Sequence, residues 1–180
     1  MSIIKKHILI ILLTTFASQV KAEEVKKMGT HKDWETYIIN NEKGKICFAQ
    51  SKPVLQAPKT SSREARLFIS FRPGENITNE ISVTSGYAFN NKNSINAISG
   101  KNKYTFDIVR ENFAWITDNK FEKKMIKTMQ VGSRIMVKAH NQKGSRIMVA
   151  GHTQNGSRTI DHYSLLGFTK AYNATKANCS

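Results

Sequence analysis

Asp161, His162 and Ser164 are the residue types of a hydrolytic centre, and they lie within four consecutive positions of the chain. A serine nucleophile needs a base within hydrogen-bond reach and a third group that orients this base. In an extended strand His162 and Ser164 share one face while Asp161 points to the other, and Ser164 is better suited to cap a following helix. We therefore predict no catalytic residue and expect a protein that is not an enzyme.

Three histidines, His140, His152 and His162, are close enough in sequence to suggest a transition-metal site. All three lie beside turn-forming residues, and no carboxylate or cysteine recurs at matching offsets. This spacing differs from known patterns of metal ligands, so we expect neither a metal site nor a cofactor.

Residues 1–22 have the organisation of a signal peptide. Lys5 and Lys6 precede an apolar run over residues 8–17, and small residues end the segment at Ala22. The apolar run is about half the ~20 residues that a membrane-spanning helix needs. We expect cleavage after Ala22 and export, with an uncleaved N-terminal anchor as the alternative. Residues 23–180 then have the length of one domain.

The two cysteines, Cys47 and Cys179, both lie in the exported part of the chain. Two thiols in an oxidising compartment usually pair, so we predict a disulfide that joins the early part of the domain to its C-terminus. Two free thiols and a nucleophilic cysteine are the alternatives. A nucleophilic cysteine requires a base and an orienting group that the sequence does not reveal.

The chain is strongly basic, with 28 lysines and arginines against 13 acidic residues. The first 22 residues hold three of the lysines and no acidic residue, so residues 23–180 carry a net charge of +12. Such a charge fits contact with anionic lipid, lipopolysaccharide or acidic glycans. A composition rich in lysine, asparagine and isoleucine would also supply this charge without any partner. Export, and the lack of arginine-rich, zinc-binding or base-stacking motifs, argue against nucleic acid.

Six segments rich in β-branched and aromatic residues are predicted strands: 34–39, 45–50, 65–71, 80–85, 103–109 and 113–117. Asparagine, glycine and proline mark turns between them. Many short strands with few helices indicate a mostly β fold, a single sandwich or barrel-like domain.

Two helical segments interrupt the strands. The first starts at Asp118 as N-cap, carries Phe121, Met125, Ile126 and Met129 at helical spacing, and ends at Gly132. The second is capped by Ser164 and carries Leu165, Phe168 and Tyr172 on a core-facing stripe that leads to Cys179.

Residues 132–155 contain a 12-residue duplication in which Gly-Ser-Arg-Ile-Met-Val occurs twice. Each copy has the pattern of a strand followed by a turn, and two copies are too few for a solenoid. We expect one copy to occupy a sheet while the other bulges out or extends a hairpin at an edge.

An ordered set of motifs spans residues 34–179. Its members are Trp34, the Gly-Lys-Ile-Cys-Phe-Ala stretch at 44–49, Arg72-Pro73, Ala114-Trp115, Ser164-Leu165-x-Gly167-Phe168 and Cys179. In this combination the chain resembles the invasion associated locus B family of exported alphaproteobacterial proteins. The duplication at 132–155 departs from the family pattern. Physically, we expect Trp34 and Trp115 in the core, a turn at Arg72-Pro73, and close packing at Gly167 within the last helix.

The resemblance implies a small envelope protein from a family named after a locus linked to host-cell entry, and it implies no catalytic residues. We therefore expect an exported, non-enzymatic envelope protein that supports host-cell attachment or invasion through binding. A periplasmic protein that maintains the envelope by acting on other envelope components is the alternative. Location in the periplasm or on the outer surface of the envelope fits both, and the partner is unknown.

Overall fold

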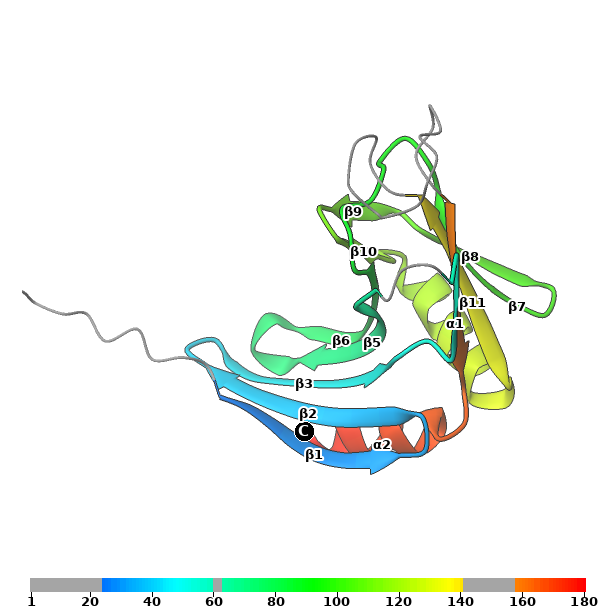
Figure 1. Cartoon of the computed structure of the whole chain (residues 1–180). Coiled ribbons are helices and arrows are strands. Elements are labelled where there is room, and N and C mark those ends of the chain that lie inside the picture. Colours follow the sequence, from blue (N-terminus) through cyan, green and yellow to red (C-terminus); the bar gives the residue numbers. More distant parts are fainter. Residues whose placement is uncertain (1–23, 60–62, 141–157) are drawn as a thin grey trace, which may run out of the picture.

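The computed structural model describes residues 24–59, 63–140 and 158–180, which form two antiparallel sheets and two helices (Figure 1). The seven-stranded sheet has the order β1-β2-β3-β5-β6-β10-β9 and curves strongly. Its strands are β1 Val25–His31, β2 Trp34–Asn41, β3 Gly44–Ser51, β5 Ala65–Arg72, β6 Ile77–Ser85, β9 Ile108–Arg110 and β10 Phe113–Trp115.

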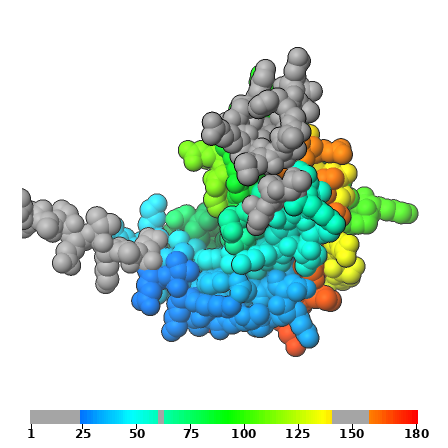
Figure 2. Space-filling model, in the orientation of Figure 1, coloured from blue at the N-terminus to red at the C-terminus, as the bar shows by residue number. Residues whose placement is uncertain are grey.

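The five-stranded sheet has the order β4-β12-β11-β7-β8. Its strands are β4 Leu55–Ala57, β7 Ile95–Ser99, β8 Asn102–Phe106, β11 Arg134–His140 and β12 Arg158–Ser164. The tip of the β7–β8 hairpin projects from the body of the molecule (green, at the right of Figure 2). The two packed sheets confirm the prediction of a mostly β, sandwich-like domain.

Alternation of side chains explains how the strands of the first sheet build the core. In β3 and β5 the side chains of Cys47, Ala49, Leu67 and Ile69 point inward and are fully buried. The side chains between them point to the opposite face. A one-residue shift would expose the whole apolar set, so burial of one face fixes the register.

The last helix, α2 (Phe168–Asn178), covers the inner face of the first three strands. The ring of Phe168 packs edge-on against Trp34 with centroids 4.9 Å apart. Trp34 is completely buried, and its Nε1 donates a hydrogen bond of 3.0 Å to the carbonyl of Ser164. This indole therefore joins the start of β2 to the end of β12.

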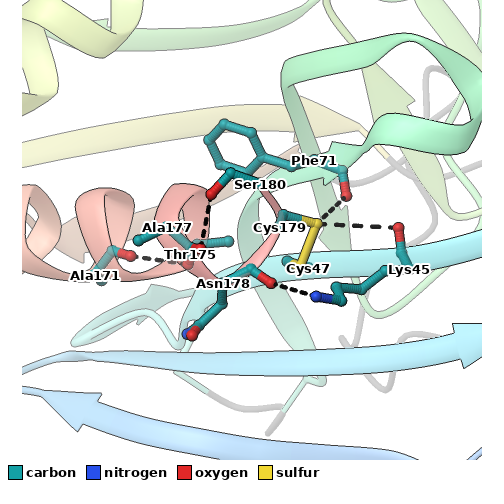
Figure 3. The surroundings of a disulfide bond; sticks show 9 residues. All are labelled: Lys45, Cys47, Phe71, Ala171, Thr175, Ala177, Asn178, Cys179 and Ser180. Atoms are coloured by element: carbon teal, nitrogen blue, oxygen red, sulfur yellow. Dashed lines mark hydrogen bonds between the residues drawn. A yellow bond between two sulfur atoms is a disulfide. The ribbon is translucent and has the colours of Figure 1, made fainter.

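The predicted disulfide between Cys47 and Cys179 is present, with Cα atoms 5.7 Å apart (Figure 3). Cys47 is fully buried in β3, and Cys179 follows the last residue of α2. Beside the disulfide, Lys45 Nζ donates to the carbonyl of Asn178 at 3.0 Å (Figure 3). The C-terminus is thus bonded to the first sheet.

The other helix, α1 (Asn119–Val131), begins and ends as predicted. Asp118 is its N-cap, and its side chain accepts hydrogen bonds from two backbone N–H groups of the first turn. Gly132 follows the last turn. One predicted position was wrong: Phe121 is 51% exposed, and Glu122 takes the inward place beside Met125 and Ile126.

Two predictions about the second helix were also wrong. Ser164 is the last residue of β12 and not a helix cap, and its hydroxyl oxygen accepts a hydrogen bond from the Leu166 N–H at 3.2 Å. Gly167 precedes α2 instead of lying within it. Its φ of +89° and a Cβ position only 1.9 Å from the His31 carbonyl oxygen both require glycine. Leu165 and Phe168 are buried as expected.

The first copy of the duplication forms β11, which lies between β7 and β12. The second copy, residues 144–155, lies outside the described residues, as do residues 1–22. The predictions of a bulged second copy and of a signal peptide therefore stay predictions.

Candidate functional site

The residues of the suspected hydrolytic centre do not assemble. Asp161 is fully buried and forms a two-pronged ion pair with the guanidinium of Arg63. His162 lies on the opposite face of β12. The Ser164 hydroxyl is engaged in the turn with Leu166. The three side chains therefore have different partners and do not contact one another as a nucleophile, base and orienting group would.

The Arg63–Asp161 pair joins the two sheets. Asp161 belongs to β12 of the second sheet, and Arg63 lies two residues before β5 of the first sheet. Arg63 also donates to the carbonyl of Ser85 at 3.0 Å and lies over the ring of Tyr87. Burial raises the pKa of Asp161, and hydrogen bonds from Arg63 partly offset this rise.

The histidines do not form a ligand cluster in the part of the chain that the structure describes. His140 and His162 lie on β11 and β12, but His162 pairs with Met136, four residues before His140. The structure therefore separates them by about 13 Å along the strand, at about 3.3 Å per residue. His152 lies outside the described residues.

The outer face of the seven-stranded sheet carries a continuous row of aromatic rings. We define the aromatic row as Tyr37, Phe48, Phe68, Phe113 and Trp115, which come from β2, β3, β5 and β10. Neighbouring centroids are 5.1, 6.1, 6.0 and 5.7 Å apart in that order. All five rings are partly buried, neither in the core nor fully in solvent. Such a row offers flat apolar surface for a ligand.

The first end of the aromatic row is fixed by a network around Glu35. Its carboxylate accepts hydrogen bonds from Lys27 Nζ at 2.5 Å, Tyr37 Oη at 2.8 Å and Gln50 Nε2 at 3.4 Å. The hydrogen bonds from Lys27 and Tyr37 lower the pKa of Glu35 to about 2. The Tyr37 ring is therefore held in place beside an ionised carboxylate.

The other end of the aromatic row opens into a cavity of about 630 Å³. Its walls come from β6, β9, β10 and the start of α1. Trp115 belongs both to the row and to this wall, next to Ile108 and Ile116. Charged groups from Arg72, Glu80, Arg110 and Glu122 complete the lining. Apolar walls with a few converging polar groups are typical of ligand pockets.

Glu122 is the buried acid of this pocket. Its Oε1 accepts a hydrogen bond of 3.0 Å from the Ile81 N–H, just beyond the point where β10 ends. The carboxyl group thus replaces a strand partner for β6. Burial raises the pKa of Glu122 to about 7, so the pocket holds a carboxyl group that exchanges its proton near neutral pH.

The two arginines of the pocket have different surroundings. Arg72 is held by Glu80 through two hydrogen bonds of 2.6 Å and by Glu75 at 3.0 Å, and the Glu80 bonds raise its pKa. Arg110 is exposed at the rim and has no ion pair among those of the described residues. Arg110 is therefore the available cation of the pocket.

The sequence motifs divide between core and surface. Trp34 lies in the core as predicted, and Pro73 begins a 3₁₀ turn (Pro73–Glu75) directly after Arg72. The prediction for Trp115 was wrong: β10 alternates, Ala114 points inward, and Trp115 lies partly buried on the outer face. The aromatic row itself was not predicted, because its members are close only through the strand register.

Two antiparallel sheets with a disulfide-bonded C-terminal helix define the fold class. In the comparison with solved structures, the chain is similar to the crystal structure of invasion associated protein B from Bartonella henselae. The TM-score is 0.53 over 83% of this chain and 96% of that chain, and sequence identity is 13%. No protein-family model and no curated protein match the chain. The likeness is one of fold, and it agrees with the mostly β architecture predicted from the strand pattern.

Proposed function

We propose that this chain is an exported envelope protein of the invasion associated locus B family that acts by binding, without catalysis. Its binding surface is the aromatic row together with the pocket at Trp115. In this proposal the protein supports host-cell attachment or invasion from the periplasm or the outer surface of the envelope.

Three observations support export to the envelope. The first 22 residues have the pattern of a signal peptide. The disulfide between Cys47 and Cys179 is typical of oxidising compartments. The fold is shared with a protein whose name links it to invasion. Among the described residues, none of the helices has the length and apolar character needed to cross a membrane.

The aromatic row is the single observation that carries the binding proposal. On the inner face of the first sheet, large apolar side chains such as Leu67 and Ile69 are covered by the core. The aromatic row leaves five adjacent rings partly open, and aromatic residues are enriched where proteins bind partners. The non-enzymatic part of the proposal is supported by the separate structural environments of Asp161, His162 and Ser164.

Binding is tested with the variant F48S/F68S, which removes two central rings of the aromatic row. The purified protein is labelled and added to cultured host cells and to isolated outer-membrane fragments of the producing bacterium. We expect at least a tenfold weaker binding, because central aromatic contacts contribute about 2 kcal/mol each. The matched control is L166S, which removes an exposed apolar side chain before α2. Equal binding by all three proteins would contradict the proposal.

The location of the protein in the envelope distinguishes a role in host-cell attachment from a role in envelope maintenance. Protease or antibody access is compared between intact producing cells and cells whose outer membrane is permeabilised. Access on intact cells is the result expected for direct contact with a host. Access only after permeabilisation would overturn attachment and favour the alternative, a periplasmic protein that maintains the envelope.

A further inference from the structure

A second surface of the molecule lies on the exposed face of α1, the helix whose first turn also lines the pocket at Trp115. Lys120, Lys123, Lys124 and Lys127 are all exposed and lie within about two turns of this helix. Lys120, Lys124 and Lys127 recur at three- and four-residue steps, so they form one stripe. The buried side chains of α1, including Met125 and Met129, lie on the other side of the helix. We call the four lysines the lysine stripe.

The lysine stripe is unfavourable for the helix itself. It contains four pairs of like charges at spacings of three or four residues, and each such pair destabilises an isolated helix. The positive end of the helix dipole lies at the first turn, where Lys120 adds further positive charge. No basic residue occupies the last turn, where it would be favourable. Helix stability therefore does not explain these lysines.

The lysine stripe also has no ion-pair partner among the described residues. All ion pairs in this part of the chain involve Lys27, Arg63, Arg66 or Arg72, and none involves the lysine stripe. The only acidic residue within α1 is Glu122, which is buried and faces Ile81. An external anionic surface would relieve the repulsion among the four ammonium groups.

Exposed apolar side chains accompany the lysine stripe. Phe121 lies near the start of α1 and is 51% exposed, and Val131 at the end of α1 is 88% exposed. Soluble polyanions offer charge but little apolar volume to such groups. A bilayer surface offers both, because apolar side chains enter the headgroup region while lysines contact lipid phosphates.

We propose that α1 docks this protein on an anionic bilayer surface through the lysine stripe, with Phe121 inserted among the headgroups. This inference is independent of the aromatic row and of its ligand. It concerns reversible contact with the surface, and each lysine is expected to strengthen binding about fivefold.

The test is co-sedimentation with vesicles of phosphatidylcholine, with and without phosphatidylglycerol. We use residues 23–180, the form expected after cleavage, so that the apolar run of residues 8–17 does not contribute to vesicle binding. We expect binding that requires phosphatidylglycerol and weakens as salt is raised, since salt screens exposed charges. Equal binding to both vesicle types, or binding unchanged by salt, would overturn the proposal.

Neutralising the lysine stripe gives the sharper comparison. K120Q/K123Q/K124Q/K127Q should bind phosphatidylglycerol vesicles at least a hundredfold more weakly. The control K26Q/K43Q/K170Q/K176Q lowers the net charge by the same amount at exposed lysines outside α1 and should lose far less. Circular dichroism checks that both variants fold. Equal losses in the two variants would show a general charge effect and contradict docking by α1.

A variant of Phe121 distinguishes binding to a bilayer from binding to a soluble polyanion. F121S keeps every charge, so it should weaken vesicle binding severalfold and leave binding to soluble heparin unchanged. Vesicle binding unaffected by F121S would contradict insertion into the headgroup region.

Discussion

Glu122 and Asp161 are both buried carboxyl groups, yet their partners differ. Asp161 faces a guanidinium with full opposite charge, whereas Glu122 accepts a hydrogen bond from a neutral backbone N–H. A neutral donor compensates less for lost hydration than an opposite charge does. Glu122 is therefore the group whose protonation changes near neutral pH. Removal of the Asp161 carboxylate would leave the buried guanidinium of Arg63 without a countercharge.

The pKa of Glu122 predicts how stability changes with pH. Its value of about 7 in the folded protein exceeds the ordinary value of 4.5. The folded state therefore binds more protons between these values, and the free energy of unfolding falls as pH rises from about 4.5 to 7. We expect this contribution to be about 2 to 3 kcal/mol.

The variant E122Q tests this prediction. Its amide oxygen can still accept from Ile81 but does not titrate, so denaturant unfolding should show E122Q to be more stable than wild type at pH 8. The control E42Q alters an exposed glutamate and should keep the wild-type pH dependence. An unchanged pH dependence in E122Q would show that Glu122 is not the responsible group.

The buried pair predicts strong coupling between Arg63 and Asp161. D161N leaves a buried guanidinium without its countercharge and should lower the free energy of unfolding by about 3 to 5 kcal/mol. R63M leaves a buried carboxylate unpaired. The double variant R63M/D161N removes both charges, so urea unfolding should show a loss well below the sum of the single losses. Additive losses would mean that the two groups do not interact.

At the scale of elements, α2 is held by contacts at both ends. Trp34 and Phe168 pack at its start, and the disulfide bonds its end to β3. The two cysteines are 132 positions apart, so the bond restricts a large part of the unfolded chain. Packing and the covalent bond together place the C-terminal helix on the inner face of the first sheet.

Removing the disulfide should lower stability. In the chain-entropy description, a loop of this length contributes about 4 to 5 kcal/mol. We expect C47S/C179S to unfold at lower denaturant concentration than wild type by a corresponding amount. Reductant should bring wild type close to the variant and leave the variant unchanged. If reductant does not affect wild type, the bond contributes no stability.

Strand prediction found β5 but missed β7 and β12, whose alternate side chains are also buried, and it missed the exposed edge strand β1. The strong alternation around Leu67 and Ile69 identified β5, whereas β1 is an exposed edge rich in lysine and was missed. The single strand predicted over 103–109 is two strands, because Asp107 binds the N–H and hydroxyl of Thr117 where the chain crosses between sheets. The place where a chain crosses between sheets depends on contacts between residues distant in sequence. The periodicity of apolar residues along one segment gives no information about such contacts.

At the scale of the whole molecule, the strand order creates the candidate binding surface. The disulfide followed from two cysteines and a predicted export signal alone. The aromatic row required the order β3-β5-β6-β10, because Phe68 and Phe113 lie 45 positions apart and become neighbours only through β6. Glu122 was not recognised either, since its role depends on where β10 ends beside β6. The sequence thus predicted the fold class and the disulfide better than it predicted the candidate binding surface.

The central claim is that the protein binds through the aromatic row, and photocrosslinking in producing cells tests this most directly. A photoreactive phenylalanine analogue replaces Phe68 in one strain and exposed Leu166 in another, and cells are irradiated alone and in contact with host cells. We predict crosslinked adducts from position 68 and not from position 166. No adduct from position 68 under either condition, or the same adducts from both positions, would contradict the claim.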